Sequence, residues 1–165
     1  MKYAICYASK TGNTKQLAEA IRESLPEEDL LYYGSCDPKA YEADRIYLGF
    51  WCYKADCSED VVAFLEGLHG KELFLFGTAG FGNVDAYFQN ILDRVKRHIP
   101  ADVTVTDTFM CQGKMPGSVR EKYVKMKETA TGSIPNWDEM IENFDCAVTH
   151  PDQADLEHLK AKIKA

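Results

Sequence analysis

Residues 3–14 read Tyr-Ala-Ile-Cys-Tyr-Ala-Ser-Lys-Thr-Gly-Asn-Thr, and this stretch decides the fold. Its first half, from Tyr3 to Tyr7, is a short apolar run that predicts a buried strand. Its second half is a loop rich in hydroxyl groups, and the apolar positions after it predict a helix over residues 15–25. A strand, a polar loop and a helix start in this order favour an anion-binding site, because free N–H groups and the helix dipole point at one place.

The loop over residues 9–14 indicates which kind of anion would bind. Ser9, Thr11 and Thr14 can donate hydrogen bonds from their hydroxyl groups, and Gly12 lets the backbone approach a ligand closely. The loop lacks the Gly-Lys-Ser/Thr ending of a nucleoside-triphosphate loop, so it suits a terminal phosphate monoester bound without metal. An ordinary capped helix start after an edge strand is the alternative interpretation, since hydroxyl caps are common.

Apolar strands alternate with helices along the rest of the chain. Further strands are predicted at 30–33, 46–49, 73–77 and 103–110, with helices after an N-cap at Ser58, over 87–99, over 119–126 and from 151 or 152 to about 164. This alternation predicts an α/β fold in which a five-stranded parallel sheet lies between two layers of helices, a three-layer α/β/α sandwich. We expect the strand order 2-1-3-4-5 and a single domain over residues 1–165.

In such a sheet the carboxyl ends of the first, third and fourth strands form the ligand site. Phe50, Trp51 and Tyr53 follow the third strand, and an aromatic ring there is suited to stack on a planar ligand. For Phe50 we favour the alternative, a place in the core. For Trp51 and Tyr53 we favour contact with the ligand.

The loop after the fourth strand, residues 78–87, completes the expected site. Gly80 and Gly82 allow its backbone to approach the edge of a planar ligand. Phe81 or Tyr87 is placed to cover the second face of such a ligand. Asp85 is the only carboxylate in this loop.

The phosphate-binding pattern has a known counterpart. Ser9, Thr11, Gly12 and Thr14 fill the pattern Thr/Ser-x-Thr-Gly-x-Thr, so the segment resembles the phosphate loop of the flavodoxin family. The resemblance implies bound flavin mononucleotide (FMN), with its phosphate in residues 9–14 and its isoalloxazine ring between aromatic residues. The cofactor-binding residues that it implies are Ser9, Lys10, Thr11, Gly12, Asn13, Thr14, Phe50, Trp51, Cys52, Tyr53, Thr78, Ala79, Gly80, Phe81, Gly82 and Tyr87.

Later segments carry a finer resemblance that covers nearly the whole chain. The runs Cys-Gln-Gly-Lys at 111–114 and His-Pro-x-x-x-Asp-Leu at 150–156 look like a branch of flavodoxin-like proteins from anaerobic gut bacteria. Gly-Phe-Trp at 49–51 and Phe-Gly-Thr at 76–78 fit the same branch. Some of its members are associated with bilirubin reduction.

Charge and hydropathy exclude several classes of partner. The 19 basic and 26 acidic residues give a net charge of −7, which argues against nucleic acid and is compatible with docking on a basic protein surface. No apolar run approaches the roughly 20 residues that span a bilayer, and we see no signal peptide. We therefore expect no membrane insertion and a cytoplasmic location.

The cysteines and histidines give no expected metal site and no expected catalytic residue. The six cysteines are expected to be reduced thiols, with Cys6 and Cys146 in packing roles and Cys111 buried. There is no Cys-x-x-Cys pair and no histidine cluster, although metal binding or a redox disulfide between Cys52 and Cys57 stays open. The four histidines are scattered along the chain. His69 and His98 are expected near helix ends and His150 in a turn, and His158 has no expected role.

Three functions are compatible with this sequence. The first is an electron carrier that shuttles electrons between a reductase and an acceptor protein, as a monomer or weak dimer. The second is an FMN-dependent reductase acting on a small acceptor, a quinone or a tetrapyrrole such as bilirubin. The third is a flavin-free interaction module.

The scarcity of carboxylates in residues 78–87 predicts a flavin that is easier to reduce than in a typical low-potential carrier.

Overall fold

The computed structural model describes residues 1–82, 84–129 and 136–164; Asn83, part of the expected 78–87 loop, lies outside them. Its strands are β1 (Tyr3–Tyr7), β2 (Leu30–Gly34), β3 (Arg45–Trp51), β4 (Glu72–Ala79) and β5 (Thr104–Gln112). Its helices are α1 (Asn13–Ser24), α2 (Glu59–Glu66), α3 (Asp85–Lys96), α4 (Gly117–Thr129), α5 (Trp137–Ala147) and α6 (Gln153–Lys164). Two short helical turns, Glu27–Asp29 and Pro38–Glu42, flank β2.

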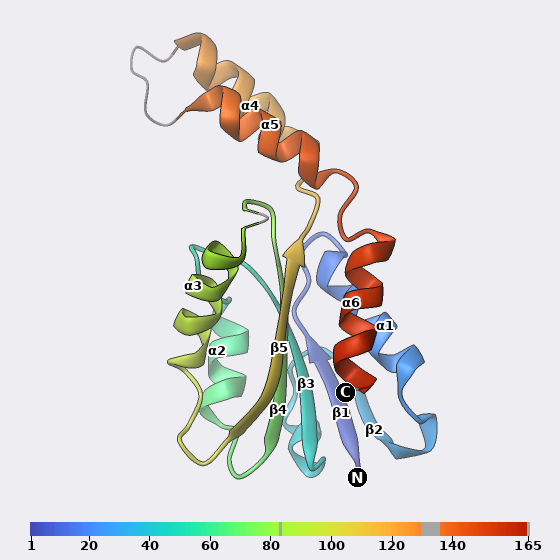
Figure 1. Cartoon of the computed structure of the whole chain (residues 1–165). Helices are drawn as coiled ribbons and strands as arrows, with labels where there is room; N and C mark the ends of the chain where they lie inside the picture. Colours follow the sequence, from blue (N-terminus) through green and yellow to red (C-terminus); the bar gives the residue numbers. More distant parts are fainter. Residues whose placement is uncertain (83, 130–135, 165) are drawn as a thin grey trace.

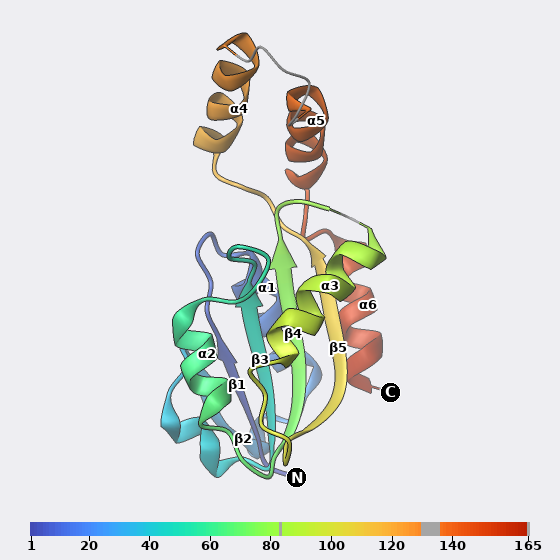
Figure 2. The ribbon, with the colours of Figure 1, turned by 90° about the vertical axis from the view of Figure 1, so that its left-hand side faces the viewer.

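The five strands form one parallel sheet in the order β2-β1-β3-β4-β5, as predicted (Figure 1). Helices α1 and α6 cover one face of the sheet, and α2 and α3 cover the other (Figures 1 and 2). The alternation of side chains along β4 shows why both faces need a cover. Leu73 and Leu75 pack in the core cluster of α2 and α3, whereas Phe74 and Phe76 pack in the cluster of α1 and α6. The predicted three-layer sandwich is confirmed.

A helical hairpin interrupts this regular pattern between β5 and α6. Helices α4 and α5 lie side by side and project beyond the carboxyl edge of the sheet (Figures 1 and 2). The two helices are held together by an ion pair, in which Arg120 Nε lies 2.8 Å from Asp145 Oδ1, and by the rings of Tyr123 and Trp137, whose centroids lie 6.0 Å apart. The hairpin therefore stands at the same edge of the sheet as the expected ligand site.

Helix α5 was not predicted, although its signals are in the sequence. Trp137, Met140, Ile141 and Phe144 have helical spacing, and the side chain of Asn136 accepts a hydrogen bond from the N–H of Glu139 as an N-cap. Among the described helices, none is long and apolar enough to cross a membrane.

Several local expectations need correction. Helix α1 begins at Asn13 rather than at residue 15, directly after Gly12, whose φ of 91° is left-handed and sets the entry of the chain into the helix. Cys6 is buried as expected, but Cys146 is exposed on α5, so its expected packing role is wrong. Ser58 does occupy the N-cap position of α2, yet its hydroxyl donates to the Asp60 carboxylate instead of capping the helix.

Candidate functional site

A cavity of about 580 Å³ opens at the carboxyl edge of the sheet, within the range of about 300–1,000 Å³ for small-molecule sites. Four segments line it: the loop after β1, the turn after β3, the end of β4 with the following loop, and the segment that joins β5 to α4. The lining residues are Ser9, Lys10, Thr11, Asn13, Thr14, Trp51, Cys52, Lys54, Ala55, Thr78, Ala79, Gly80, Phe81, Tyr87, Gly113, Lys114, Met115, Pro116, Ser118 and Val119.

The loop after β1 presents hydroxyl donors to this cavity. Ser9 Oγ accepts hydrogen bonds from the N–H of Gly12 at 3.1 Å and of Lys15 at 3.4 Å. Thr11 Oγ1 accepts one from Asn13 Nδ2 at 3.0 Å. A hydroxyl that accepts in this way keeps its own proton to donate, and neither proton has an acceptor among the described residues. The loop therefore offers two oriented donors to an oxyanion.

The start of α1 adds backbone donors. No side chain caps this helix, and its hydrogen-bond ladder begins with Gln16 N–H bonding Gly12 O at 3.1 Å. The N–H groups of Asn13 and Thr14 therefore have no acceptor within the helix. The Thr14 side chain is engaged differently from our expectation, because its buried hydroxyl already bonds Phe50 O at 3.2 Å and Thr78 Oγ1 at 3.0 Å.

Phe50 and Trp51 are the last two residues of β3, which extends beyond the predicted strand at 46–49, and only Tyr53 follows it. The three rings have three different environments. Trp51 lines the cavity, with the ammonium group of Lys10 5.3 Å from its ring centroid. Tyr53 is 42% exposed and packs edge-on against Trp51 with 5.4 Å between centroids, but it does not line the cavity. Phe50 is fully buried in the core, as its alternative interpretation predicted. Gly12 and Gly82 also lie outside the lining.

The turn after Trp51 places two residues in a strained conformation against the cavity. Tyr53 and Asp56 exchange backbone hydrogen bonds of 2.8 and 2.9 Å, which leaves a two-residue turn between them. The turn residues Lys54 and Ala55 both have left-handed φ values, 51° and 60°, that usually favour Asn or Gly. Both residues line the cavity, so the strain is located at the candidate site.

The fourth wall of the cavity, residues 113–119, was missed by the sequence analysis. Met115 packs against Gly80, since a Cβ atom at Gly80 would lie 2.5 Å from Met115 Cγ. Asn13 Nδ2 donates to the carbonyl of Lys114 at 2.8 Å, which ties this wall to the loop after β1. Residues 101 positions apart in the chain meet in this bond, and spacing in the sequence carries no signal of such a contact.

A polar network connects the helical hairpin to the loop after β4. Asn143 on α5 donates from Nδ2 to Gly80 O at 3.0 Å, and its Oδ1 accepts from Gly82 N–H at 3.1 Å. Gln112 Nε2 at the end of β5 donates to the same Oδ1 at 3.0 Å. The Asn143 amide thus holds the 80–82 backbone from both sides, although neither Asn143 nor Gln112 was predicted to contribute to the site.

This network gives a test of the hairpin's role. We expect Asn143→Ala to weaken ligand binding in the cavity by about 1–3 kcal/mol, because the Gly82 N–H loses its partner. Gly80 O and Gln112 Nε2 keep only their bond to each other, so the 80–82 backbone is held less firmly. Calorimetric titration with FMN measures the loss. Asn90→Ala, on the exposed face of α3, is the control and should bind as the wild type does. Equal affinities for both variants would show that the network does not position this loop.

The charge around the cavity is positive. Lys10, Lys54 and Lys114 line it, and no carboxylate is present among the described lining residues. Burial raises the pKa of the Cys52 thiol and of the Tyr87 phenol, so both side chains are neutral at pH 7. The site is therefore suited to an anionic ligand and contains no preformed thiolate nucleophile.

The family assignment follows from the match of this sequence to known proteins. A model of the flavodoxin domain matches residues 4–164. This chain belongs to the flavodoxin family. A curated relative, the flavodoxin-like domain-containing protein BilS of Clostridium symbiosum, is 37% identical to this flavodoxin-family chain, over 94% of the chain and 90% of the relative. The predicted resemblance to the flavodoxin family is confirmed.

Solved structures show that the fold is shared with flavodoxins. A short-chain flavodoxin associated with a bacterial microcompartment superposes with a TM-score of 0.59 at 15% identity, over 99% of this chain and 95% of that protein. A flavoprotein of Lactobacillus acidophilus, solved in complex with FMN, has a TM-score of 0.50 at 15% identity, over 66% of this chain and 92% of that protein. The match to the flavodoxin domain makes this chain a member of a family of redox proteins.

Proposed function

We propose that this protein binds FMN in the cavity and carries electrons between a reductase and an acceptor protein. The observation that carries the proposal is the set of free donors at the phosphate end, the Ser9 and Thr11 hydroxyls and the uncapped start of α1. These groups match a phosphate monoester in charge and in hydrogen bonding. The FMN complex of the Lactobacillus protein, which has the same fold, supports this choice of ligand.

The remaining walls fit the isoalloxazine end of the cofactor. Trp51 and Phe81 offer aromatic surface, and Gly80 lies in the cavity wall with Met115 packed against it. Bound FMN would supply the electron storage and transfer, while the protein orients it and sets its electrostatic surroundings. Phe81 is 45% exposed, and Tyr53 beside Trp51 is 42% exposed, so both present apolar surface next to the cavity. We propose that redox partners bind to this exposed surface. We also propose that the protein works in the cytoplasm.

Titration of the flavin-stripped protein with FMN tests the proposal directly. We expect saturable binding of one FMN per chain, which is detected by the quenching of flavin fluorescence. Anaerobic mixing of the loaded protein with NADPH then separates a carrier from a reductase. A carrier is reduced only when a flavodoxin reductase is added. Rapid reduction by NADPH alone would assign a reductase, with a quinone or a tetrapyrrole as its acceptor, and absence of FMN binding would overturn both functions.

The lysines around the cavity should raise the reduction potential of the flavin. Replacing Lys10, Lys54 and Lys114 together with alanine removes three positive charges that favour the anionic reduced form. These side chains are exposed and screened by salt, so we expect a combined effect of about 1 kcal/mol, or about 40 mV towards lower potential for a one-electron couple. Spectroelectrochemistry measures this shift.

A triple alanine variant at Lys39, Lys122 and Lys164 is the matched control. These three lysines are exposed and lie outside the cavity lining, and their replacement changes the net charge by the same amount. An equal shift in both triple variants would attribute the effect to net charge and not to the cavity.

A further inference from the structure

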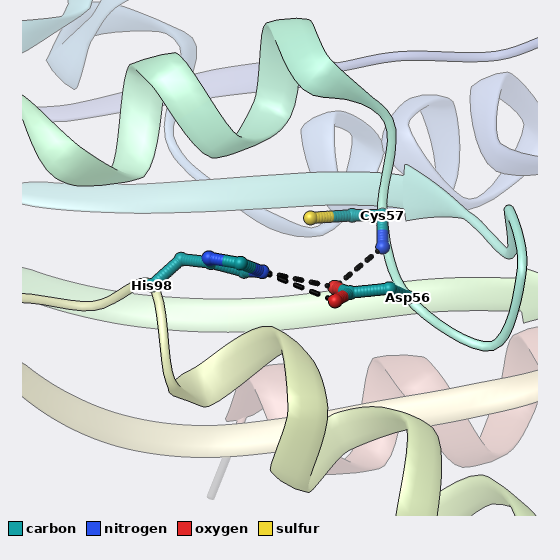
Figure 3. Close-up of side chains that lie close together, drawn as sticks. All are labelled: Asp56, Cys57 and His98. Atoms are coloured by element: carbon teal, nitrogen blue, oxygen red, sulfur yellow. Dashed lines mark hydrogen bonds and ion pairs between the residues drawn. The ribbon is translucent and has the colours of Figure 1, made fainter.

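Three potential metal ligands meet beside the strained turn, and none of them is part of the lining of the cavity that we assign to FMN. Asp56 ends the turn, Cys57 follows it directly, and His98 comes from the segment after α3 (Figure 3). His98 Nε2 lies 3.1 Å from Asp56 Oδ2 and 3.2 Å from Asp56 Oδ1, and Asp56 Oδ1 also accepts from the N–H of Cys57 at 2.8 Å. Figure 3 shows that the Cys57 side chain extends beside the His98–Asp56 hydrogen bonds, with its sulfur directed towards His98.

The three ligand atoms are one sulfur, one nitrogen and one oxygen, and all lie within 4.8 Å of one another. Zinc binds these three ligand types at about 2.0–2.3 Å, which places neighbouring ligands about 3.3–3.8 Å apart in a tetrahedron. A small inward movement of the side chains is therefore enough to surround one ion. Soft thiolate together with imidazole favours zinc over magnesium or calcium, which prefer oxygen ligands.

We propose that Asp56, Cys57 and His98 form a binding site for Zn²⁺, with water as the fourth ligand. The Cys57 side chain is buried, whereas the side chains of His98 and Asp56 are 26% and 33% exposed, so an ion and its water can enter from their side. On binding, the His98–Asp56 hydrogen bond is replaced by bonds from both groups to zinc. The proton on His98 Nε2 is released, and the neutral ring carries its proton on Nδ1 instead. The Cys57 thiol transfers its proton to solvent and binds as a thiolate, and no electron is transferred.

The surroundings of Cys57 favour the neutral thiol as long as no cation is bound. Burial and the neighbouring Asp56 carboxylate raise the pKa of the Cys57 thiol to about 12. A divalent cation reverses this balance, since a thiol that coordinates zinc is deprotonated outright. The cation also neutralises the carboxylate that otherwise disfavours the thiolate.

The second cluster of potential ligands, His150, Asp152 and Asp155, is less suited to zinc. Its two carboxylates already form the start of α6, where the N–H of Asp152 bonds Asp155 Oδ2 at 2.9 Å and the N–H of Asp155 bonds Asp152 Oδ1 at 2.9 Å. This cluster contains no thiol. Binding at Asp56, Cys57 and His98 would instead connect the turn that carries Lys54 and Ala55 to the end of α3.

Zinc binding is measured on the full-length protein with its bound flavin, while a phosphine keeps the cysteine thiols reduced. A chromophoric chelator competes with the protein for zinc and reports the affinity. We expect one equivalent of zinc to bind. The X-ray absorption spectrum at the zinc edge should contain one sulfur at about 2.3 Å and nitrogen or oxygen neighbours at about 2.0–2.2 Å. A spectrum without sulfur, or the absence of binding, would overturn the site.

Substitutions locate the ion. Asp56→Asn, Cys57→Ser and His98→Gln should each weaken zinc binding at least about tenfold. Cys146→Ser and His158→Gln, at exposed positions on α5 and α6, should leave it unchanged. If Cys57→Ser does not fold, the other two variants decide. Zinc affinity that survives the substitutions would overturn the proposal, and this result is independent of whether FMN binds, because the flavin-stripped protein can be titrated in the same way.

Discussion

Replacing Phe50 with alanine should lower the free energy of unfolding by about 3–5 kcal/mol. Phe50 is fully buried, and its ring packs so closely on Gly77 that a Cβ atom there would lie 2.5 Å from the ring. The substitution leaves a cavity in the core that the sheet cannot close, because protein interiors are densely packed. Urea denaturation of the flavin-free protein, followed by circular dichroism, measures the loss.

Phe81→Ala is the matched control for this prediction. Phe81 lines the cavity and is 45% exposed, so its removal should change the free energy of unfolding by less than about 1 kcal/mol. Its effect should be on the affinity for FMN instead. A Phe50→Ala variant that is as stable as Phe81→Ala would contradict the assignment of Phe50 to the core.

Removing the free hydroxyls of the phosphate loop should have the largest effect on FMN binding. In the double variant Ser9→Ala and Thr11→Val, a bound phosphate loses two donors, each contributing about 1.5–3 kcal/mol to a charged acceptor. We expect the dissociation constant of FMN to rise at least about a hundredfold. The fold should tolerate both changes, because Thr11 is exposed and Ser9 is only half-buried. Fluorescence titration measures the affinity.

Two controls define what this result means. Thr104→Val, at an exposed position of β5, makes the same chemical change as Thr11→Val away from the cavity and should bind FMN normally. Thr14→Val removes a hydroxyl that bonds Phe50 and Thr78, so its main effect should be on stability. Unchanged FMN affinity in the double variant would refute the phosphate assignment. If Thr14→Val lost more FMN affinity than the double variant, the Thr14 hydroxyl would have to leave Phe50 and Thr78 and bond the phosphate.

The sequence predicted the sheet because its signals are local. Each strand is a short apolar run, and every connection except that from β2 to β3 contains helical spacing, so the layers follow from the alternation. The strand order is the one typical of five-stranded doubly wound sheets. The loop at 9–14 could also be predicted, since its hydroxyl groups and glycine are adjacent in the chain. Trp51, Gly80 and Phe81 were predicted for the same reason, because Trp51 ends β3 and the other two directly follow β4.

Contacts between distant residues were decided only by the tertiary structure. Phe50 and Tyr53 are both aromatic and therefore suited to stack on a ligand. Phe50 is buried, however, in the strand β3 that pairs with β4, and Tyr53 is exposed in the turn. The wall at 113–119 and the Asn143 network depend on where the hairpin leaves the sheet, which no local pattern encodes. His98 meets Asp56 across 42 positions, and this distance explains why spacing predicted no metal ligand there. By itself the sequence determined the fold and the hydroxyl-rich loop at residues 9–14, because their signals are local. Side-chain packing over long separations decided which residues surround the cavity.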